Sequence, residues 1–351
     1  MPFDDRLIAE TDPRARRRVA LWLFALCGML LVMIGLGGAT RLTGSGLSIM
    51  EWAPILGALP PLSEAEWQRL YGLYQQIPQY ELINKGFGID GFKEIFWLEW
   101  AHRLWGRLIG LAFIGPLLWF AWTGAVGRRL LPRLGLLFVL GGAQGAVGWF
   151  MVASGFFPDS TAVSPYRLVV HLGFALALYA ALLWTGLGEW RGARQEAVPG
   201  GLRAAAWGLT GLATLAVLAG GFVAGLKAGF TYNSFPLMDG RLVPAGYGDL
   251  SPWPRNLTEN VAAVQFDHRL LATLMLLAAL LAAWRFLAEL SGLAAAALFA
   301  LVLTVLAQYG LGVMTLLWVV PVALGTAHQM LAVLVLSAAL VLLHAARAPS
   351  L

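Results

Sequence analysis

Charged side chains are scarce in this chain. Asp, Glu, Lys and Arg make up 12% of its 351 residues, whereas apolar residues make up 59%. A soluble globular protein carries about 25% charged residues, so this composition excludes an ordinary water-soluble fold. The chain also has a single cysteine, Cys27, which excludes an intramolecular disulfide and a metal cluster built from cysteines. We expect Cys27 to be a small buried thiol.

Long apolar stretches recur along the whole chain. A helix needs roughly 20 apolar residues to cross about 30 Å of hydrocarbon. Eight stretches reach that length, at 19–39, 95–123, 131–153, 165–188, 203–225, 260–287, 293–317 and 321–345. The sequence therefore predicts an all-α polytopic membrane protein with eight transmembrane helices.

The first apolar stretch follows a group of arginines, a layout that a secretory signal peptide shares. Its apolar core is too long for a signal peptide, and GGATRLTGSG continues after it without a cleavage site. We therefore interpret it as a retained helix. Acidic residues such as Asp4 and Asp5 argue against a mitochondrial transit peptide, which is poor in acids. This favours a bacterial plasma membrane.

Lys and Arg are concentrated in short segments on one side of the predicted helices. These segments are the tail 1–18 and the turns 124–133 and 189–203. Because cytoplasmic loops carry the excess of positive charge, both termini are expected in the cytoplasm, with the long segments 40–94 and 226–259 outside. The net charge of +5 follows from this bias and indicates no nucleic-acid partner.

The two halves of the chain share one plan. GGATRLTGSG at 37–46 matches GGFVAGLKAG at 220–229, AHRL at 101–104 matches DHRL at 267–270, and GGAQGAVG at 141–148 matches LAQYGLGV at 306–313. These matches predict two pseudo-symmetric four-helix bundles, 19–188 and 203–346, with a cytoplasmic linker at 189–202. Within the outer segment 40–94, SEAE at 63–66 is a capping box that predicts a short external helix.

Four histidines lie at matching depths in the even-numbered spans. They are His102, His171, His268 and His328. Each lies about 10 to 13 Å below the outer boundary if the helices rise 1.5 Å per residue. A lone histidine in a membrane helix is most often a hydrogen-bonding residue between helices. Four matched ones predict two pairs, and two imidazoles on facing helices can bind a haem iron from both sides.

The residues around the histidines fit a haem better than a zinc ion. Zinc needs three or four ligands from one cluster, and the sequence offers no such cluster. Small residues stand one turn after each histidine and would leave clearance for a flat macrocycle. They are Gly106, Ala175, Ala272 and Ala332. The fifth histidine, His344, lies at the inner end of the last span and belongs to neither pair.

The two halves differ three residues before the first histidine of each pair. Glu99 precedes His102, whereas the neutral Gln265 precedes His268. A carboxylate in an apolar site has a raised pKa and can move protons. We therefore expect chemistry in the first half and electron transfer in the second. The alternative is a structural ion pair between Glu99 and Arg103 at four-residue spacing, and both roles are compatible.

Several arginines lie near the expected depth of a haem rim. Anionic propionates need cationic or hydrogen-bonding partners, although snorkelling to the membrane interface explains any single arginine equally well. The candidates are Arg41, Arg103, Arg107, Arg167 and Arg269.

Three segments together resemble the haem A synthases. They are GGATRLTGSGLSIMEWAPILGALPP at 37–61, FKEIFWLEWAHRLWGR at 92–107 and NSFPLMDG at 233–240. The resemblance extends over nearly the whole chain. It implies eight helices in two pseudo-symmetric bundles and oxidation of the ring-D methyl group of haem O to a formyl group, which makes the haem A of cytochrome oxidase.

The resemblance also implies roles for individual residues. His268 and His328 match the ligands of a resident haem b, whereas His102 and His171 match those expected to hold the substrate haem O. Glu99 matches an acidic residue important for the oxidation. Some family members have a cysteine pair in an outer loop, which this chain lacks, so a thiol step cannot apply here.

The implied partners are haem O, haem A, the lipid membrane, an unidentified electron donor and, as candidates, haem O synthase and cytochrome oxidase assembly factors. Two alternatives remain open at this point. The chain could be a two-haem cytochrome that oxidises quinol, although such cytochromes tend to carry paired histidines on one helix. It could also be a haem chaperone or transporter in which Glu99 is only structural.

Overall fold

The computed structural model describes residues 12–54, 56–192 and 197–347, which form helices and turns and no β-strand within these ranges. Within these ranges, eight long apolar helices are able to cross a membrane, and each coincides with one predicted span. They are α1 (Pro13–Leu42), α3 (Gly88–Trp122), α4 (Leu130–Ala153), α5 (Pro165–Arg191), α6 (Leu202–Gly225), α8 (Val261–Phe286), α9 (Gly292–Leu317) and α10 (Val322–Ala345). The prediction of an eight-helix membrane protein is confirmed.

Local chemistry explains where several helices begin. Asp12 accepts a hydrogen bond from the backbone N–H of Arg14, with a proline at the first position of α1, and Asn260 accepts from two backbone N–H groups at the start of α8. These side chains satisfy donors that a helix leaves unpaired at its amino end. The predicted tail 1–18 therefore contains the first turn of α1, and residues 1–11 of that tail lie outside the described residues.

Helix α3 begins earlier than the sequence predicted. It starts at Gly88, so His102 lies about two turns further from the start of its helix than expected. The added turns pack against α2 (Glu64–Tyr74), which begins at the predicted cap, where Ser63 accepts from the backbone N–H of Glu66. Phe92 on these turns and Phe96 just after them are buried with Trp67 and Tyr74. This external cluster gives the apolar residues of α2 a partner within the protein.

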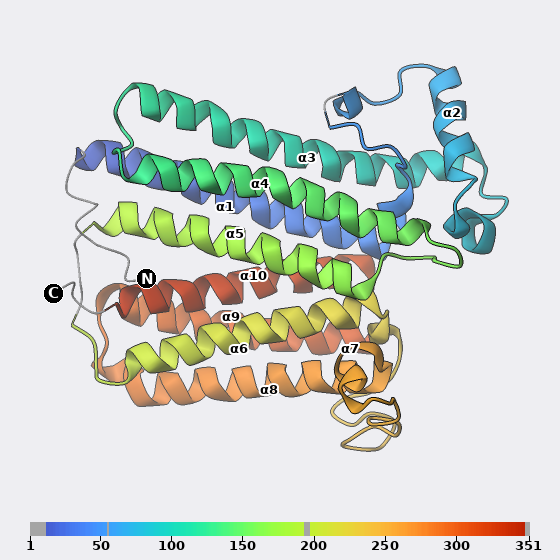
Figure 1. The fold of residues 1–351 in the computed structure, drawn as a ribbon. Helices are drawn as coiled ribbons and strands as arrows, with labels where there is room; N and C mark the ends of the chain where they lie inside the picture. Colours follow the sequence, from blue (N-terminus) through green and yellow to red (C-terminus); the bar gives the residue numbers. More distant parts are fainter. Residues whose placement is uncertain (1–11, 55, 193–196, 348–351) are drawn as a thin grey trace.

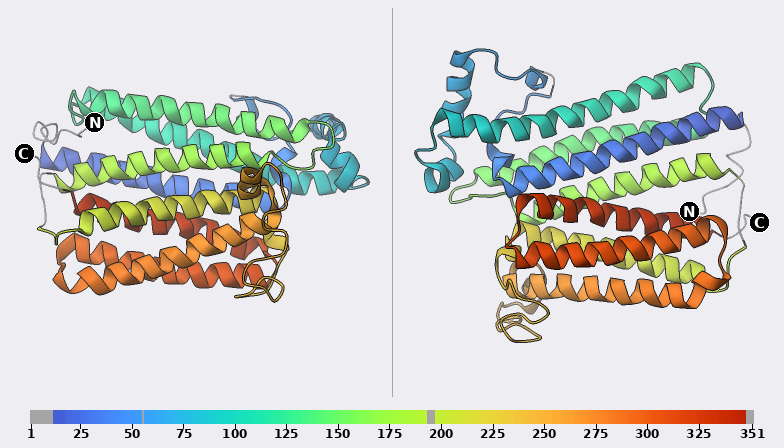
Figure 2. Two further views of the ribbon diagram at one scale, coloured as in Figure 1. Left: turned by 60° about the horizontal axis from the view of Figure 1, so that its bottom comes forward. Right: turned by 180° about the vertical axis from the view of Figure 1, so that it is seen from behind.

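The helices run side by side, and the first four spans lie together on one side of the last four (Figures 1 and 2). Helix α1 packs on α3 and α5 in the first half, as α6 packs on α8 and α10 in the second. The halves meet through α1 against α10, α5 against α6, and α5 against α10. The segments 43–87 and 226–260 lie at one end of the molecule, and the short α7 (Asn256–Glu259) is in the second of them (Figure 1).

Close packing is concentrated toward the opposite end of the helices. Leu23, Leu202, Leu298 and Leu342 are completely buried in one apolar core, which also contains Cys27. The cysteine is buried and free, as expected. His344 is buried at this end as well, where Arg191 donates to its backbone carbonyl over 2.7 Å. The four matched histidines lie toward the other end and are only half-buried.

Candidate haem sites

Each of the four histidine rings lies against a glycine on the preceding long helix. The pairs are His102 with Gly37, His171 with Gly148, His268 with Gly220, and His328 with Gly312. A Cβ added to these glycines would lie 3.2, 3.0, 3.0 and 2.8 Å, respectively, from the nearest ring atom. Such distances are shorter than an ordinary carbon contact of about 3.5–4.0 Å. The backbone of the odd-numbered spans therefore supports the rings, and any larger residue at these positions would have to displace them.

The two rings of the second pair, His268 and His328, face each other across a short gap. The ring centres of His268 and His328 are 6.4 Å apart, and the ring planes are nearly perpendicular at 89°. Nδ1 of His268 lies 3.1 Å from the carbonyl oxygen of Ala216. When Nδ1–H donates to that carbonyl, Nε2 keeps its lone pair for a metal.

Polar atoms without partners cluster at the same place. Nδ1 of His328 and the Oε1 atom of Gln308 are buried and accept or donate no hydrogen bond. Buried polar atoms in native proteins are almost always satisfied, so these two atoms indicate a ligand site. Metal–imidazole bonds are about 2 Å long, so an iron bound to both rings would hold their centres roughly 6 Å apart. The donor set and spacing fit a haem with two histidine ligands.

The first pair has a similar environment. Gln144 donates through Nε2 to the backbone carbonyl of His171 over 3.0 Å and lies 3.2 Å from its Nδ1, while its Oε1 is buried without a partner. Gln308 contacts His328 in the second half at 3.4 Å. No group of three or more His, Cys, Asp or Glu side chains gathers among the described residues, so a zinc cluster has no support there.

Neither glutamine was recognised as a site residue from the sequence. A signal was present, because GGAQGAVG and LAQYGLGV align Gln144 with Gln308 and Gly148 with Gly312. In a membrane helix these glycines resemble ordinary small residues at helix contacts. Their contact with histidine rings on other helices became visible only in three dimensions.

Glu99 is 3% exposed and makes four hydrogen bonds with the protein. One oxygen accepts from the Ser48 hydroxyl at 2.7 Å and from the Ile49 backbone N–H at 2.9 Å. The other accepts from Arg103 at 2.6 and 3.1 Å. The ion pair with Arg103 therefore forms, as the structural alternative predicted. A proton could reach either oxygen only by displacing one of these donors.

Gln265 occupies the corresponding position with the opposite polarity. Its Nε2 donates to the carbonyls of Ala228 and Thr231 at 2.7 and 2.6 Å, and its Oε1 accepts from Arg269 at 2.8 Å. Arg269 also donates to two carbonyls of the loop after α6. Both halves thus hold the loop after their first helix by a residue three positions before a histidine. Only the first half does so with a negative charge.

The outer segment 48–54 is fastened along α3 beside His102. Arg103 donates to the carbonyls of Ile49 and Glu51, and Arg107 donates to those of Ala53 and Pro54. In the same segment, the Trp52 ring reaches α4, with its centre 6.2 Å from that of Trp149. The segment therefore runs along α3 past the level of His102 and reaches α4.

The two remaining arginine candidates also have protein partners. Arg41 donates to the carbonyl of Ala224 on α6 at 3.2 Å, which joins the two halves. Arg167 donates to the carbonyl of Phe150 at 2.8 Å and lies over its ring, 3.9 Å from the centre. Arg269 differs from these because its Nε is buried without a partner.

A side chain next to His328 connects the two sites. Gln329 on α10 donates to the carbonyl of Ile34 on α1 at 3.0 Å. Its Oε1 lies 2.7 Å from the place that a Cβ on Gly38 would occupy. Gly38 follows Gly37, which supports the His102 ring. One turn of α1 therefore contacts His102 and the neighbour of His328.

Similarity to known proteins identifies the family of this chain. Residues 20–340 match the family model described as cytochrome oxidase assembly protein. This chain belongs to that family. It is 60% identical over 339 residues to the heme A synthase of Granulibacter bethesdensis, covering 95% of this chain and 89% of the relative. It is 50% identical over 335 residues to the heme A synthase of Azorhizobium caulinodans, covering 95% of each chain.

A third relative, the heme A synthase of Nitrosospira multiformis, is 46% identical over 344 residues, covering 96% of each chain. The resemblance to this family that the motifs indicated is confirmed. Together with the eight apolar helices, these bacterial relatives support a multi-pass membrane protein.

Proposed function

We propose that this protein oxidises the ring-D methyl group of haem O to a formyl group, which makes haem A. The observation that carries the proposal is the pair of histidine sites with a buried carboxylate, Glu99, three residues before the histidine in only one of them, where the other has Gln265. Membership of the cytochrome oxidase assembly family and the names of the relatives support the same reaction.

The chain is proposed to divide into two pseudo-symmetric four-helix bundles, 19–188 with its outer segment 40–94 and 203–346. The matched histidine–glycine contacts support this division. So do the corresponding loop contacts of Glu99 and Gln265. The short connection 189–202 includes residues 193–196, which lie outside the described residues.

In the first bundle, His102 and His171 hold haem O with the reacting methyl group toward Glu99. Four donors fix the Glu99 carboxylate, so its main role is a fixed negative charge that stabilises positive charge developing at the methyl carbon. The segment 48–54, fastened by Arg103 and Arg107, limits access of water from the outer side. Two successive two-electron oxidations convert the methyl group to an alcohol and then to a hydrated aldehyde that loses water. An external oxidant takes up the four electrons, and water or dioxygen supplies the oxygen atom.

In the second bundle, His268 and His328 hold a resident haem b, which supplies a route for electrons when bound. Gln265 places no charge beside this site, so the site suits electron transfer without turnover. Arg269 is the favoured propionate partner because its Nε has no protein acceptor. Arg41, Arg103, Arg107 and Arg167 would contact propionates with donors that remain beyond their protein hydrogen bonds.

The protein is placed in a bacterial plasma membrane with both termini in the cytoplasm and the haem sites toward the outer leaflet. The positive charge of the turns 124–133 and 189–203 supports this orientation. The long segments 43–87 and 226–260 lie together at the histidine end (Figure 1). The protein partners are an electron donor and, as candidates, haem O synthase and cytochrome oxidase assembly factors.

The test is pigment extraction from membranes of a host that makes haem O but no haem A. Expression of the protein should produce formyl haem, whereas the Glu99→Gln variant should bind haem and leave haem O largely unchanged. A two-haem quinol cytochrome or a haem chaperone would leave haem O unchanged in both cases. That result with the parent protein would refute the proposed reaction.

A further inference from the structure

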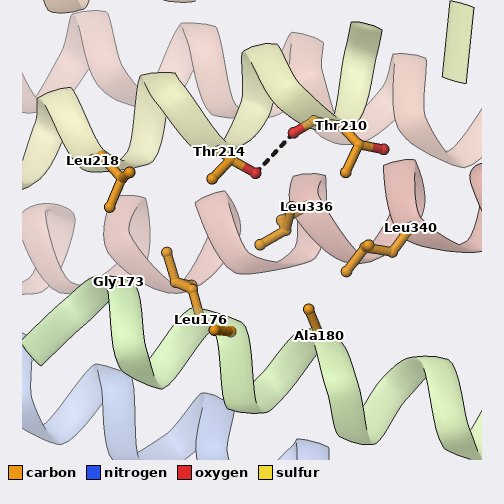
Figure 3. Close-up of a pocket in the computed structure, with 9 residues that line it drawn as sticks. Gly173, Leu176, Ala180, Thr210, Thr214, Leu218, Leu336 and Leu340 are labelled. Atoms are coloured by element: carbon orange, nitrogen blue, oxygen red, sulfur yellow. Dashed lines mark hydrogen bonds between the residues drawn. The ribbon is translucent and has the colours of Figure 1, made fainter. Parts of the chain in front are cut away.

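A cavity of about 220 Å³ lies between the two halves, bounded by α5, α6 and α10 (Figure 3). Gly173 lies at one end, two residues after His171, and Leu340 lies toward the inner end of α10. Along its wall, Leu336 and Leu176 are each only 3% exposed, whereas Ala177 is exposed at the rim. Most of the cavity wall is therefore buried inside the protein, and the cavity opens to the outside of the protein beside Ala177 on α5.

The side chains that line the cavity leave no hydrogen-bond donor free for a ligand. Its only polar side chains are Thr210 and Thr214, whose hydroxyls donate to the carbonyls of Ala206 and Thr210, each within α6. All other lining residues are aliphatic or glycine. Because water and polar groups need several partners, this surface favours an apolar occupant.

The corresponding place on the other side of the molecule carries more side-chain volume in total. The matched histidines and glycines align each lining residue with a residue of α1, α5 or α10. In five of these pairs the smaller residue lines the cavity: Gly173 against Met330, Ala177 against Leu334, Ala180 against Ser337, Leu336 against Tyr179, and Thr214 against Leu31. Two pairs have the larger residue at the cavity, Leu218 against Gly35 and Leu176 against Val333.

Two contacts show how the larger residues pack there. Met330 packs on Gly35, just as Leu218 packs on Gly173 at the cavity, with large and small residues exchanged. The hydroxyls of Tyr179 and Ser337 are 2.8 Å apart, and Leu336 and Ala180 at the cavity cannot form such a contact. Interiors are close-packed when nothing else is to be accommodated, so the difference between the two sides indicates a space kept for a ligand.

We propose that this cavity binds one flexible hydrocarbon chain, inserted past Ala177 between α5 and α6. Two sources have this chemistry, the isoprenoid tail of haem O and an acyl chain of a membrane lipid. Gly173, at one end of the cavity, lies near His171. That end is therefore within reach of the tail of a haem O bound in the first bundle. The substrate source rests on the proposed function, whereas the lipid source does not.

The test uses the full protein in nanodiscs that contain phosphatidylcholine with a diazirine in one acyl chain. After irradiation, mass spectrometry should find adducts on the buried Leu336 and Leu340, which chains that stay outside the protein cannot reach. The variant Ala177→Leu with Thr214→Leu places the residues of the other side at two cavity positions and should reduce these adducts several-fold. Gly211→Met, at an exposed position of α6 with no neighbour within 4 Å, should leave them unchanged.

Added haems distinguish the two sources. If haem O reduces the adducts several-fold and haem b, which has no tail, does not, the substrate tail is the occupant. If neither reduces them, the occupant is a lipid chain, and this result stands even if the protein converts no haem. Adducts on Leu336 and Leu340 no more abundant than in the double variant would overturn the proposal. So would a higher unfolding temperature of the double variant with unchanged adducts, because it would identify a simple packing defect.

Discussion

Exchanging the residues at positions 99 and 265 tests why only the first half carries a carboxylate. In Glu99→Gln, one carboxylate oxygen becomes an NH₂ group. If that group faces Ile49, two donors meet; if it faces Arg103, a donor meets a guanidinium. Either orientation leaves a buried donor unsatisfied, which costs about 1–3 kcal/mol. In Gln265→Glu, an acceptor would instead face the carbonyls of Ala228 and Thr231, at a similar cost.

Two measurements separate structure from chemistry in these variants. Thermal unfolding of the purified protein should show comparable destabilisation for Glu99→Gln and Gln265→Glu. Conversion of haem O in membranes should fall strongly only for Glu99→Gln. Ser48→Ala is the matched control, because it removes one hydrogen bond to Glu99 but keeps the charge, so it should retain most of the conversion.

The reasoning is refuted if Glu99→Gln converts haem O as fast as the parent protein. It is also refuted if Ser48→Ala loses conversion as completely as Glu99→Gln. In that case the fastening of the outer loop would be the role of Glu99, and its charge would have no part in the chemistry.

Three further outcomes follow from other contacts. Gly220→Ala should displace His268 and reduce the low-spin absorption of the haem proposed for the second bundle, whereas Gly208→Ala, with no neighbour within 4 Å, should not; equal spectra would contradict the support by glycine. Gln329→Leu should destabilise the protein by about 0.5–1.5 kcal/mol and alter the electron paramagnetic resonance signal of that proposed haem, because the neighbour of His328 loses its bond to α1; an unaltered signal would exclude this link. Arg69 hydrogen-bonds Glu51 and thereby lowers the pKa of that exposed carboxyl. Because the pKa of Glu51 is lower in the folded protein, this carboxyl stabilises the fold at pH values above its unfolded pKa of about 4.3. The stabilisation is lost as the pH falls through the lowered pKa of the folded protein. The difference in the free energy of unfolding between the parent and Arg69→Gln should therefore be small at neutral pH, below about 1 kcal/mol, and should vanish in acid. A difference that grows in acid would reverse the assignment.

The transmembrane architecture could be predicted because apolar length is a one-dimensional property. All eight spans followed from apolar length, and the cap of α2 followed from the motif SEAE, since both depend on residues close together in sequence. The early start of α3 could not, because Gly88 to Glu94 is polar and becomes helical through packing against Trp67 and Tyr74. Such an interaction between separate segments is absent from local periodicity.

The histidine sites were predictable in part for the same reason. Matched spacing identified His102 and its three counterparts, and four-residue spacing identified the pair of Glu99 and Arg103. The supporting glycines and Gln144 could not be recognised, because their function depends on a ring from another helix. The donors Ser48 and Ile49 also come from a loop whose approach to α3 only the folded chain reveals.

The position of α1 limits how independent the two halves can be. Gly37 supports a ring of the first site, and one residue later Gly38 receives the side chain beside His328. If the chain 203–346 were produced alone, the face of α10 around Gln329 and Met330 would lose its covering helix, along with the hydrogen bond to Ile34. Despite the repeated sequence, the second half is therefore an incomplete folding unit, and separately expressed halves should need each other to retain haem.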